Sequence, residues 1–220
     1  MRKIAANYLF PISGQPIRNG YVLLSDDGII VETGQLSRET PNTEFYNGIL
    51  SPGFVNVHCS SELQRSLPYA LSDIYNSGTQ VIADMDKGTF VELPDSSEQI
   101  IAGRTVEANI ICPFCNSMTE NISPPVEEMR ECGATICIGT GNGIPARIPS
   151  MIDAIKLLQI NSKSINELLL WSTLNGAKAI GKENNFGSFE AGKRPGVVLI
   201  EYIDWDNFSL TKESRSRRIA

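Results

Sequence analysis

The sequence predicts an α/β protein, with a parallel sheet in the middle of the chain and a small β domain built from its two ends. Two observations lead to this prediction. Between residues 53 and 192, apolar strand-like runs alternate with helical stretches, which is typical of parallel strands joined by crossover helices. Short β-type runs occupy residues 1–52, and another follows residue 193. We therefore expect residues 1–52 and 193–220 to form a composite β-sandwich and residues 53–192 to form a second domain.

The expected strands of the terminal domain are short apolar runs bounded by turn residues. They cover residues 4–10, 21–25 and 28–34, and turns at Ser13-Gly14 and at Asp26-Asp27-Gly28 separate them. Residues 196–203 read G-V-V-L-I-E-Y-I and could complete a sheet begun by the N-terminal strands. The basic run from Lys212 to Arg218 is expected to be a solvated tail.

In the central part, strands are expected at residues 53–59, 79–85, 108–112 and 134–139. Asp95 with Glu98 forms a capping box, which predicts a helix through about residue 107. Further helices are expected before Gly133, at about residues 150–160, and from Ser164 to a C-terminal glycine at Gly181.

Composition is that of an ordinary folded protein and excludes some classes of function. The 220 residues are 41% hydrophobic and 20% charged, enough for one moderate domain or two small ones. The net charge of −6 argues against nucleic-acid binding through the overall field of the protein. No signal-type or membrane-spanning apolar run is present, so a cytoplasmic protein is expected. Five cysteines, an odd number, indicate reduced thiols rather than a disulfide framework.

Four stretches in the expected order resemble the amidohydrolase superfamily, in particular its deaminase-like, metal-dependent members. Residues 50–62 read L-S-P-G-F-V-N-V-H-C-S-S-E, similar to the first barrel strand with its His-x-His pair. The others are C-P-F-C-N-S at 112–117, a helix and strand ending in Gly-Thr-Gly at 126–141, and residues 173–200, which resemble the family's return to its sandwich. The resemblance implies a β-sandwich beside a (β/α) barrel that holds one or two metal ions, such as Zn or Fe, for hydrolytic deamination.

Most of the catalytic residues that this resemblance implies are missing. His58 matches the first metal ligand, but Ser60 stands in the place of the second, and Gly141 stands where active members have an aspartate. His58 is the only histidine in the chain, so the two further metal histidines have no counterpart. Glu62 matches a common acidic position but would have no metal beside it. We expect no cofactor and no intact catalytic set, with His58 and Glu62 as vestiges.

The length of the chain also predicts an incomplete barrel. A (β/α)₈ barrel takes about 250 residues, and after the sandwich only about 150 remain. The matched strands correspond to strands seven, eight, one and two, with residues 89–93 as a stub of strand three. These are neighbours in a closed barrel, so a contiguous partial barrel is expected. Its open edges favour a homodimer.

Several smaller features have alternative interpretations. Cys112 and Cys115 form a C-x-x-C pair, which could be redox-active or could bind Zn with His58 or Cys59, although one such pair is a weak signal. Gly139 to Gly143 is a glycine-rich loop that could bind an anion, but it lacks the spacing of a nucleotide fingerprint. Asp84 and Asp86 could bind a cation, although hydrogen bonding at a strand end is the more common role for such residues.

The sequence therefore favours a degenerate amidohydrolase-family protein without hydrolytic activity. The first alternative is a working hydrolase of non-peptide C–N bonds with a histidine-poor metal centre. The second is a non-catalytic module that binds a small molecule or another protein.

Overall fold

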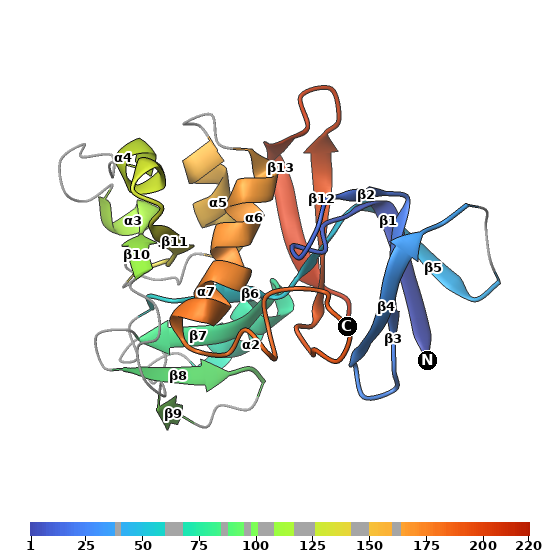
Figure 1. The fold of residues 1–220 in the computed structure, drawn as a ribbon, viewed down its shortest axis with the longest axis horizontal. Coiled ribbons are helices and arrows are strands. Elements are labelled where there is room, and N and C mark those ends of the chain that lie inside the picture. Colours follow the sequence, from blue (N-terminus) through green and yellow to red (C-terminus); the bar gives the residue numbers. More distant parts are fainter. Residues whose placement is uncertain are drawn as a thin grey trace.

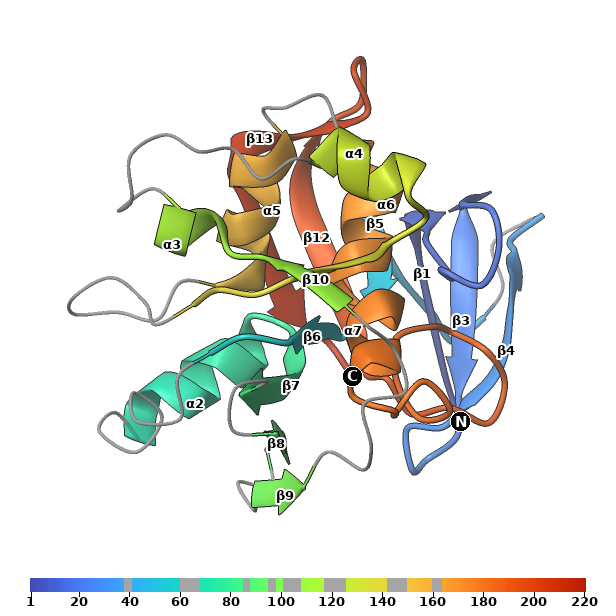
Figure 2. The same ribbon diagram turned by 60° about the vertical axis from the view of Figure 1, so that its left-hand side comes forward.

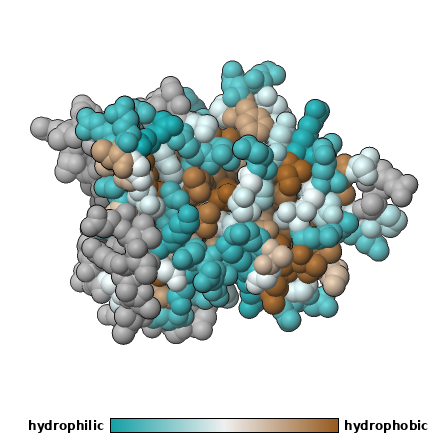
Figure 3. Space-filling view, viewed as in Figure 1, coloured by the Kyte–Doolittle hydropathy of each residue, from teal (hydrophilic) through white to brown (hydrophobic). Residues whose placement is uncertain are grey.

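A computed structural model describes residues 1–37, 41–59, 68–84, 88–94, 98–100, 108–116, 126–141, 150–159 and 164–220. Strands from the two ends of the chain form one sheet. Helices α5 (Met151–Gln159) and α6 (Ile165–Ser172) lie between this sheet and the strands β10 (Ala108–Ile111) and β11 (Thr135–Ile138; Figure 1). The view in Figure 3 shows hydrophobic side chains in separate patches among hydrophilic ones. Within the described ranges, no helix is both long and apolar enough to cross a membrane.

The two ends of the chain share a seven-stranded sheet. Its order is β13-β12-β5-β1-β3-β4, and the short strand β2 pairs with β1. The bounds are β1 (Arg2–Leu9), β2 (Ile17–Arg18), β3 (Gly20–Leu24), β4 (Ile30–Gln35), β5 (Thr43–Pro52), β12 (Val197–Asp204) and β13 (Ser209–Arg218). Strands β1 and β5 are parallel, and the other pairs are antiparallel. The four strands expected in this region are confirmed, whereas β5 was not predicted.

The basic run at residues 212–218 belongs to β13, so the prediction of a solvated tail was wrong. Strand β13 pairs antiparallel with β12, for example Leu199 opposite Arg217. The guanidinium carbon of Arg215 lies 4.9 Å from the ring centroid of Tyr202. That of Arg217 lies 5.4 Å from the ring of Tyr46. Backbone pairing and cation–π contacts thus accommodate charged residues in a strand.

The four expected central strands are present as two parallel pairs. Strand β6 (Phe54–Asn56) pairs with β7 (Thr79–Asp84), and β10 (Ala108–Ile111) pairs with β11 (Thr135–Ile138; Figure 2). A parallel bridge between Cys59 and Gly141 joins the two pairs just beyond the ends of β6 and β11. The strands therefore follow one another in the order β10, β11, β6, β7, as the sequence predicted.

After β7 the chain departs from the predicted pattern. Strand β8 (Thr89–Glu92) runs antiparallel to β7, so residues 89–93 are not the start of a third parallel strand. The four residues between Asp84 and Thr89 are too few for a parallel crossover, which needs about a dozen. Strand β9 (Glu98–Ile100) pairs antiparallel with β8, so the helix predicted from Asp95 through about residue 107 is wrong at these three residues. The other residues of that predicted helix lie outside the described ranges.

The described helices are α2 (Pro68–Asn76), α3 (Pro113–Asn116), α4 (Val126–Glu131), α5 (Met151–Gln159), α6 (Ile165–Ser172) and α7 (Leu174–Ala179). Ser164 caps α6 by accepting a hydrogen bond from the backbone N–H of Glu167, as predicted. The single helix expected after Ser164 is divided at Thr173, whose hydroxyl donates to the carbonyl oxygen of Leu169 at 2.6 Å. Gly181 follows α7 with a φ of 68°, the conformation expected of a C-terminal glycine.

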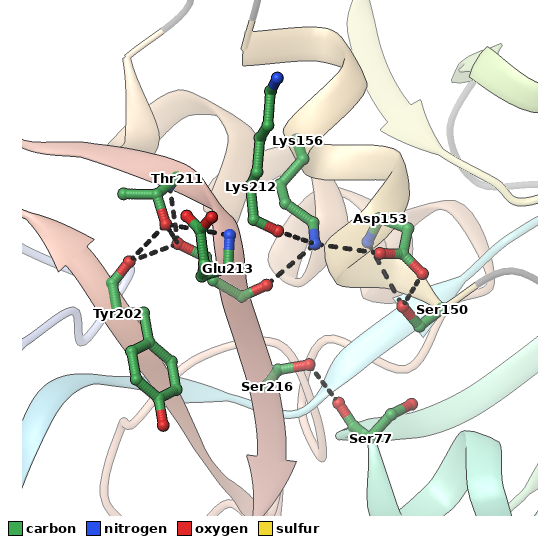
Figure 4. A network of polar contacts seen from close by, with 10 residues as sticks. Ser77, Ser150, Asp153, Lys156, Tyr202, Thr211, Lys212, Glu213 and Ser216 are labelled. Atoms are coloured by element: carbon green, nitrogen blue, oxygen red, sulfur yellow. Dashed lines mark hydrogen bonds and ion pairs between the residues drawn. The ribbon is translucent and has the colours of Figure 1, made fainter.

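Helices α5 and α6 connect the terminal sheet with β11 through one hydrophobic core. Ile155 and Leu168 on the helices pack in a cluster with Ile138 of β11 and Ile200 of β12. Polar contacts reinforce the attachment (Figure 4). Nζ of Lys156 on α5 donates to the carbonyl oxygen of Ser214 on β13 at 2.9 Å. The two ends of the chain are therefore fixed against the central strands.

Candidate functional site

The candidate site lies where β6 and β11 end, around the single histidine. His58 follows β6 and is half-buried. Its backbone carbonyl accepts a hydrogen bond from the N–H of Gly141 at 2.7 Å. Its backbone also forms an antiparallel bridge with Asp84 at the end of β7. Three of the residues singled out from the sequence, His58, Asp84 and Gly141, are thus brought together at one end of the parallel strands.

A buried pair of polar side chains, Asn56 and Thr140, connects β6 to the segment after β11. Nδ2 of Asn56 donates to Oγ1 of Thr140 at 2.7 Å, and Oδ1 of Asn56 accepts from the Thr140 N–H at 3.1 Å. The same Oδ1 atom accepts from the N–H of His58 at 3.3 Å. Sequence reasoning missed this pair. The two-residue alternation of the strand, which places Asn56 on the same face as His58, is the signal that could have indicated it.

Gly139 allows the backbone after β11 to approach His58 closely. A Cβ atom at residue 139 would lie 2.6 Å from Cβ of His58 and 3.1 Å from Sγ of Cys112. Cys112 is buried and follows β10. Cβ of His58 and Sγ of Cys112 therefore both lie close to Gly139, so the ends of β6 and β10 approach each other.

Gly141, at the position where active relatives are expected to carry an aspartate, has a left-handed backbone with a φ of 70°. This conformation favours glycine. Its N–H is occupied by the carbonyl of His58. The residue therefore has a structural role in the bridge between β6 and β11, and it has no side chain with which to accept a proton.

The structure describes the side chains of four of the five cysteines. Cys59, Cys112, Cys132 and Cys137 are not in disulfides, in agreement with the expected reduced state. Burial raises the pKa of the Cys137 thiol to about 12, so this thiol stays protonated at neutral pH. Cys115 lies in α3, and its side chain is outside the described part of the structure.

Other predicted site residues lie outside the described residues. These are Ser60, Glu62, Asp86 and the second half of the glycine-rich loop, Asn142 and Gly143.

The donor set does not fit the family's metal centre. Within the described part of the chain, no three His, Cys, Asp or Glu side chains are close enough to hold a metal ion together. The complete sequence offers one imidazole, whereas the resemblance to the amidohydrolase family implies at least three metal-binding histidines. The described part of the site contains the half-buried imidazole of His58, the Asp84 carboxylate, the Cys112 thiol and the buried Asn56–Thr140 pair.

Comparison with known proteins connects this geometry to a family. A model described as the amidohydrolase family matches residues 79–219. A 5-methylthioadenosine/S-adenosylhomocysteine deaminase of Moorella thermoacetica is 26% identical over 142 residues, which are 56% of this chain and 33% of that protein. The first curated relatives are matched over only 27–33% of their own length.

Two solved structures share the fold. The aminofutalosine deaminase of Helicobacter pylori aligns with a TM-score of 0.68 and 14% identity, covering 100% of both chains. A zinc-bound adenosine deaminase of Xanthomonas campestris aligns with a TM-score of 0.66 and 13% identity, covering 90% of this chain and 84% of that one.

Proposed function

The chain belongs to the amidohydrolase family, and on this premise we propose that it is a degenerate member that does not carry out the family's metal-dependent hydrolysis. One observation carries the proposal. His58 is the only histidine of the chain, and the residue brought against it from the end of β11 is Gly141 rather than an acid. An imidazole alone supplies one metal ligand and leaves the coordination sphere open.

The contacts around His58 support a structural role for what remains of the site. The backbone N–H and carbonyl of His58 are bonded to Asn56 and Gly141, respectively. Asn56 and Thr140 satisfy each other while almost fully buried. These bonds hold the ends of β6 and β11 together. A site that has lost its catalytic residues can therefore still stabilise the fold.

For the architecture, we infer a partial (β/α) barrel at residues 53–192 beside a β-sandwich made from residues 1–52 and 193–220. The strand order β10, β11, β6, β7 supports this inference, because it is the order of strands seven, eight, one and two in a closed barrel. The antiparallel meander of β8 and β9 follows β7 in place of a third parallel strand.

The open edge of such a partial barrel supports a second proposal, that two copies associate. Within the described residues, β10 pairs with β11 on one side alone. An unpaired strand edge presents backbone N–H and carbonyl groups that a second copy can pair.

The proposed loss of activity is tested by measuring metal and ammonia together. The chain is purified without chelator, and Zn, Fe and Mn are determined by elemental analysis on one size-exclusion peak. Ammonia release from 5-methylthioadenosine and S-adenosylhomocysteine is assayed with and without added Zn or Fe. We expect far less than one metal per chain and no ammonia.

A working hydrolase with a histidine-poor centre would give the opposite result. It would hold about one metal per chain and release ammonia, and both would be lost in His58→Ala but kept in Cys132→Ser, which alters an exposed thiol directly after α4. That outcome would overturn the proposal and make Cys112 the next ligand to substitute.

A further inference from the structure

A cavity lies at the end of the parallel strands opposite to His58. It has a volume of about 420 Å³ and is lined by residues that include Tyr75, Gln80, Leu93, Arg194, Gly196 and Arg218. Gln80 is near the start of β7, whereas His58 follows the end of β6, and these two strands are parallel. The cavity is therefore separate from the candidate site, and its volume is within the range of small-molecule pockets.

Arg218 is the most unusual residue of this cavity. Its guanidinium carbon lies 4.2 Å from the ring centroid of Tyr75 on α2. On another side, a Cβ at residue 196 would lie 2.3 Å from Nη2 of Arg218, so the glycine leaves room for the guanidinium. Nη1 is buried without a hydrogen-bond partner. A partly buried guanidinium group without a full set of hydrogen-bond partners destabilises the folded protein unless an anion lies beside it.

The second guanidinium strengthens the positive field. Arg194 also lines the cavity, and its side chain is exposed. Burial lowers the pKa of Arg218, and the nearby charge of Arg194 lowers it in the same direction. The two cations therefore face one cavity at close range without a carboxylate bonded to Arg218 among the described residues.

Gln80 adds a hydrogen-bond acceptor to the same cavity. The residue is only 5% exposed, and its Nε2 atom donates to the carbonyl oxygen of Leu93 at 2.9 Å. This bond fixes the orientation of the amide and leaves Oε1 buried with no partner. A ligand that carries a hydroxyl or amino group would satisfy Oε1.

Ala220 also lines the cavity, and one oxygen of its carboxyl group accepts from the N–H of Val197 at 2.7 Å. Ala220 is thereby held along β12. Arg218 and Arg194 are the cationic side chains of the wall, and Glu92 is its one acidic side chain.

We propose that this cavity binds a small organic oxyanion with a hydroxyl or amino group, with Arg218 and Arg194 contacting the anionic oxygens and Gln80 accepting from the neutral donor. Carboxylates and phosphate esters share this chemistry. Planar guanidinium groups bind both through paired hydrogen bonds.

Calorimetric titration of the full chain with two probes tests the proposal. Glycerol 3-phosphate represents phosphate esters and glycerate represents carboxylates, while glycerol and sodium chloride of equal ionic strength are the controls. We expect saturable one-to-one binding of at least one oxyanion and none of the controls. The probe that binds more tightly identifies the class of anion.

Three variants locate the binding. Arg218→Gln and Arg194→Gln should each weaken the affinity by about tenfold or more. Arg217→Gln should leave it unchanged, because Arg217 is the neighbour of Arg218 on the same strand but pairs with Glu201. If circular dichroism shows that Arg218→Gln does not fold, the affinity of Arg194→Gln tests the proposal by itself. Arg194 is exposed, so its substitution should not disturb the fold.

Absence of binding by both anions, equal binding of glycerol, or unchanged affinity in Arg194→Gln would each overturn the proposal. None of these results depends on metal content or ammonia release, so the proposed loss of hydrolysis is tested separately.

Discussion

Lys156 on α5 donates a hydrogen bond from Nζ to the backbone carbonyl oxygen of Ser214 on β13, over 2.9 Å. The two residues are 58 positions apart. The same ammonium group forms an ion pair with Asp153 at 3.1 Å (Figure 4). One side chain thus attaches the last strand of the chain to a helix that packs against the central strands.

Replacing Lys156 with methionine should lower the free energy of unfolding by about 1 kcal/mol, because a partly buried carbonyl and a carboxylate lose their donor while the apolar stem is kept. Urea denaturation checks this value. Lys212→Met is the matched control, since Lys212 contributes its carbonyl rather than its ammonium group to this network. Equal losses in the two variants would contradict a specific role for Lys156.

Asn56 should be the most costly polar residue to remove near His58. Asn56→Ala leaves the Thr140 hydroxyl and two backbone N–H groups without their partner in a buried setting, so we expect a loss of about 3 kcal/mol in urea denaturation. Thr140→Val removes one hydroxyl and keeps the backbone bond, and should cost about 1 kcal/mol. A double-mutant cycle should show coupling between the two substitutions, and strictly additive losses would argue against a direct interaction.

The central strands could be predicted because each is a short apolar run bounded by turn residues, and their order could be predicted from the resemblance to the amidohydrolase family. Strand β13 could not be predicted from the same signals. Its residues 212–218 are mostly charged, which locally favours a solvated segment, and the aromatic rings that hold three of its arginines come from β12, β5 and α2. Contacts between positions so far apart in the sequence leave no local pattern to detect.

In the candidate site, too, some features could be predicted from the sequence and others could not. A single histidine is a fact of composition, and the family resemblance places Gly141 where an aspartate is expected, so the proposed loss of the metal-binding set rests on the sequence. The Asn56–Thr140 pair joins residues 84 positions apart, so strand alternation could have indicated Asn56 beside His58 but not Thr140 as its partner. The strand at Glu98–Ile100 was mistaken for a helix because the Asp95–Glu98 pattern describes only local capping, whereas pairing with β8 decides the conformation.

Self-association should be visible by light scattering on a purified, monodisperse sample. We expect a mass of twice the 24.1 kDa of one chain, because the free edge of β10 can pair with a second copy. The mass should be independent of added Zn or Fe. A stable, monodisperse monomer would contradict this prediction.

Glu44 should make the stability of the terminal sheet depend on acid pH. The bidentate bond from Arg2 lowers the pKa of Glu44 from 4.5 to about 2. A carboxylate with a lowered pKa in the folded state contributes its full stabilisation above pH 4.5 and loses it as the pH falls towards 2. Both side chains are partly exposed, so the contribution is moderated by solvent and salt.

Urea denaturation across this pH window should therefore show a weaker pH dependence in Glu44→Gln than in the unchanged chain. Glu128→Gln, on an exposed face of α4, removes the same charge and serves as the control. An unchanged slope in Glu44→Gln would show that the Arg2 contact contributes nothing in solution.

Gly139 offers the sharpest test of how closely the ends of β6, β10 and β11 approach. In Gly139→Ala, the new methyl group would lie 2.6 Å from Cβ of His58 and 3.0 Å from its backbone nitrogen, so the strand ends must separate. Overpacking of this kind costs about 1–3 kcal/mol, and we expect a loss of that size in urea denaturation. Gly14→Ala is the control, because a Cβ there has no atom within 4 Å. A neutral Gly139→Ala would mean that the ends of β6, β10 and β11 are further apart than these distances state.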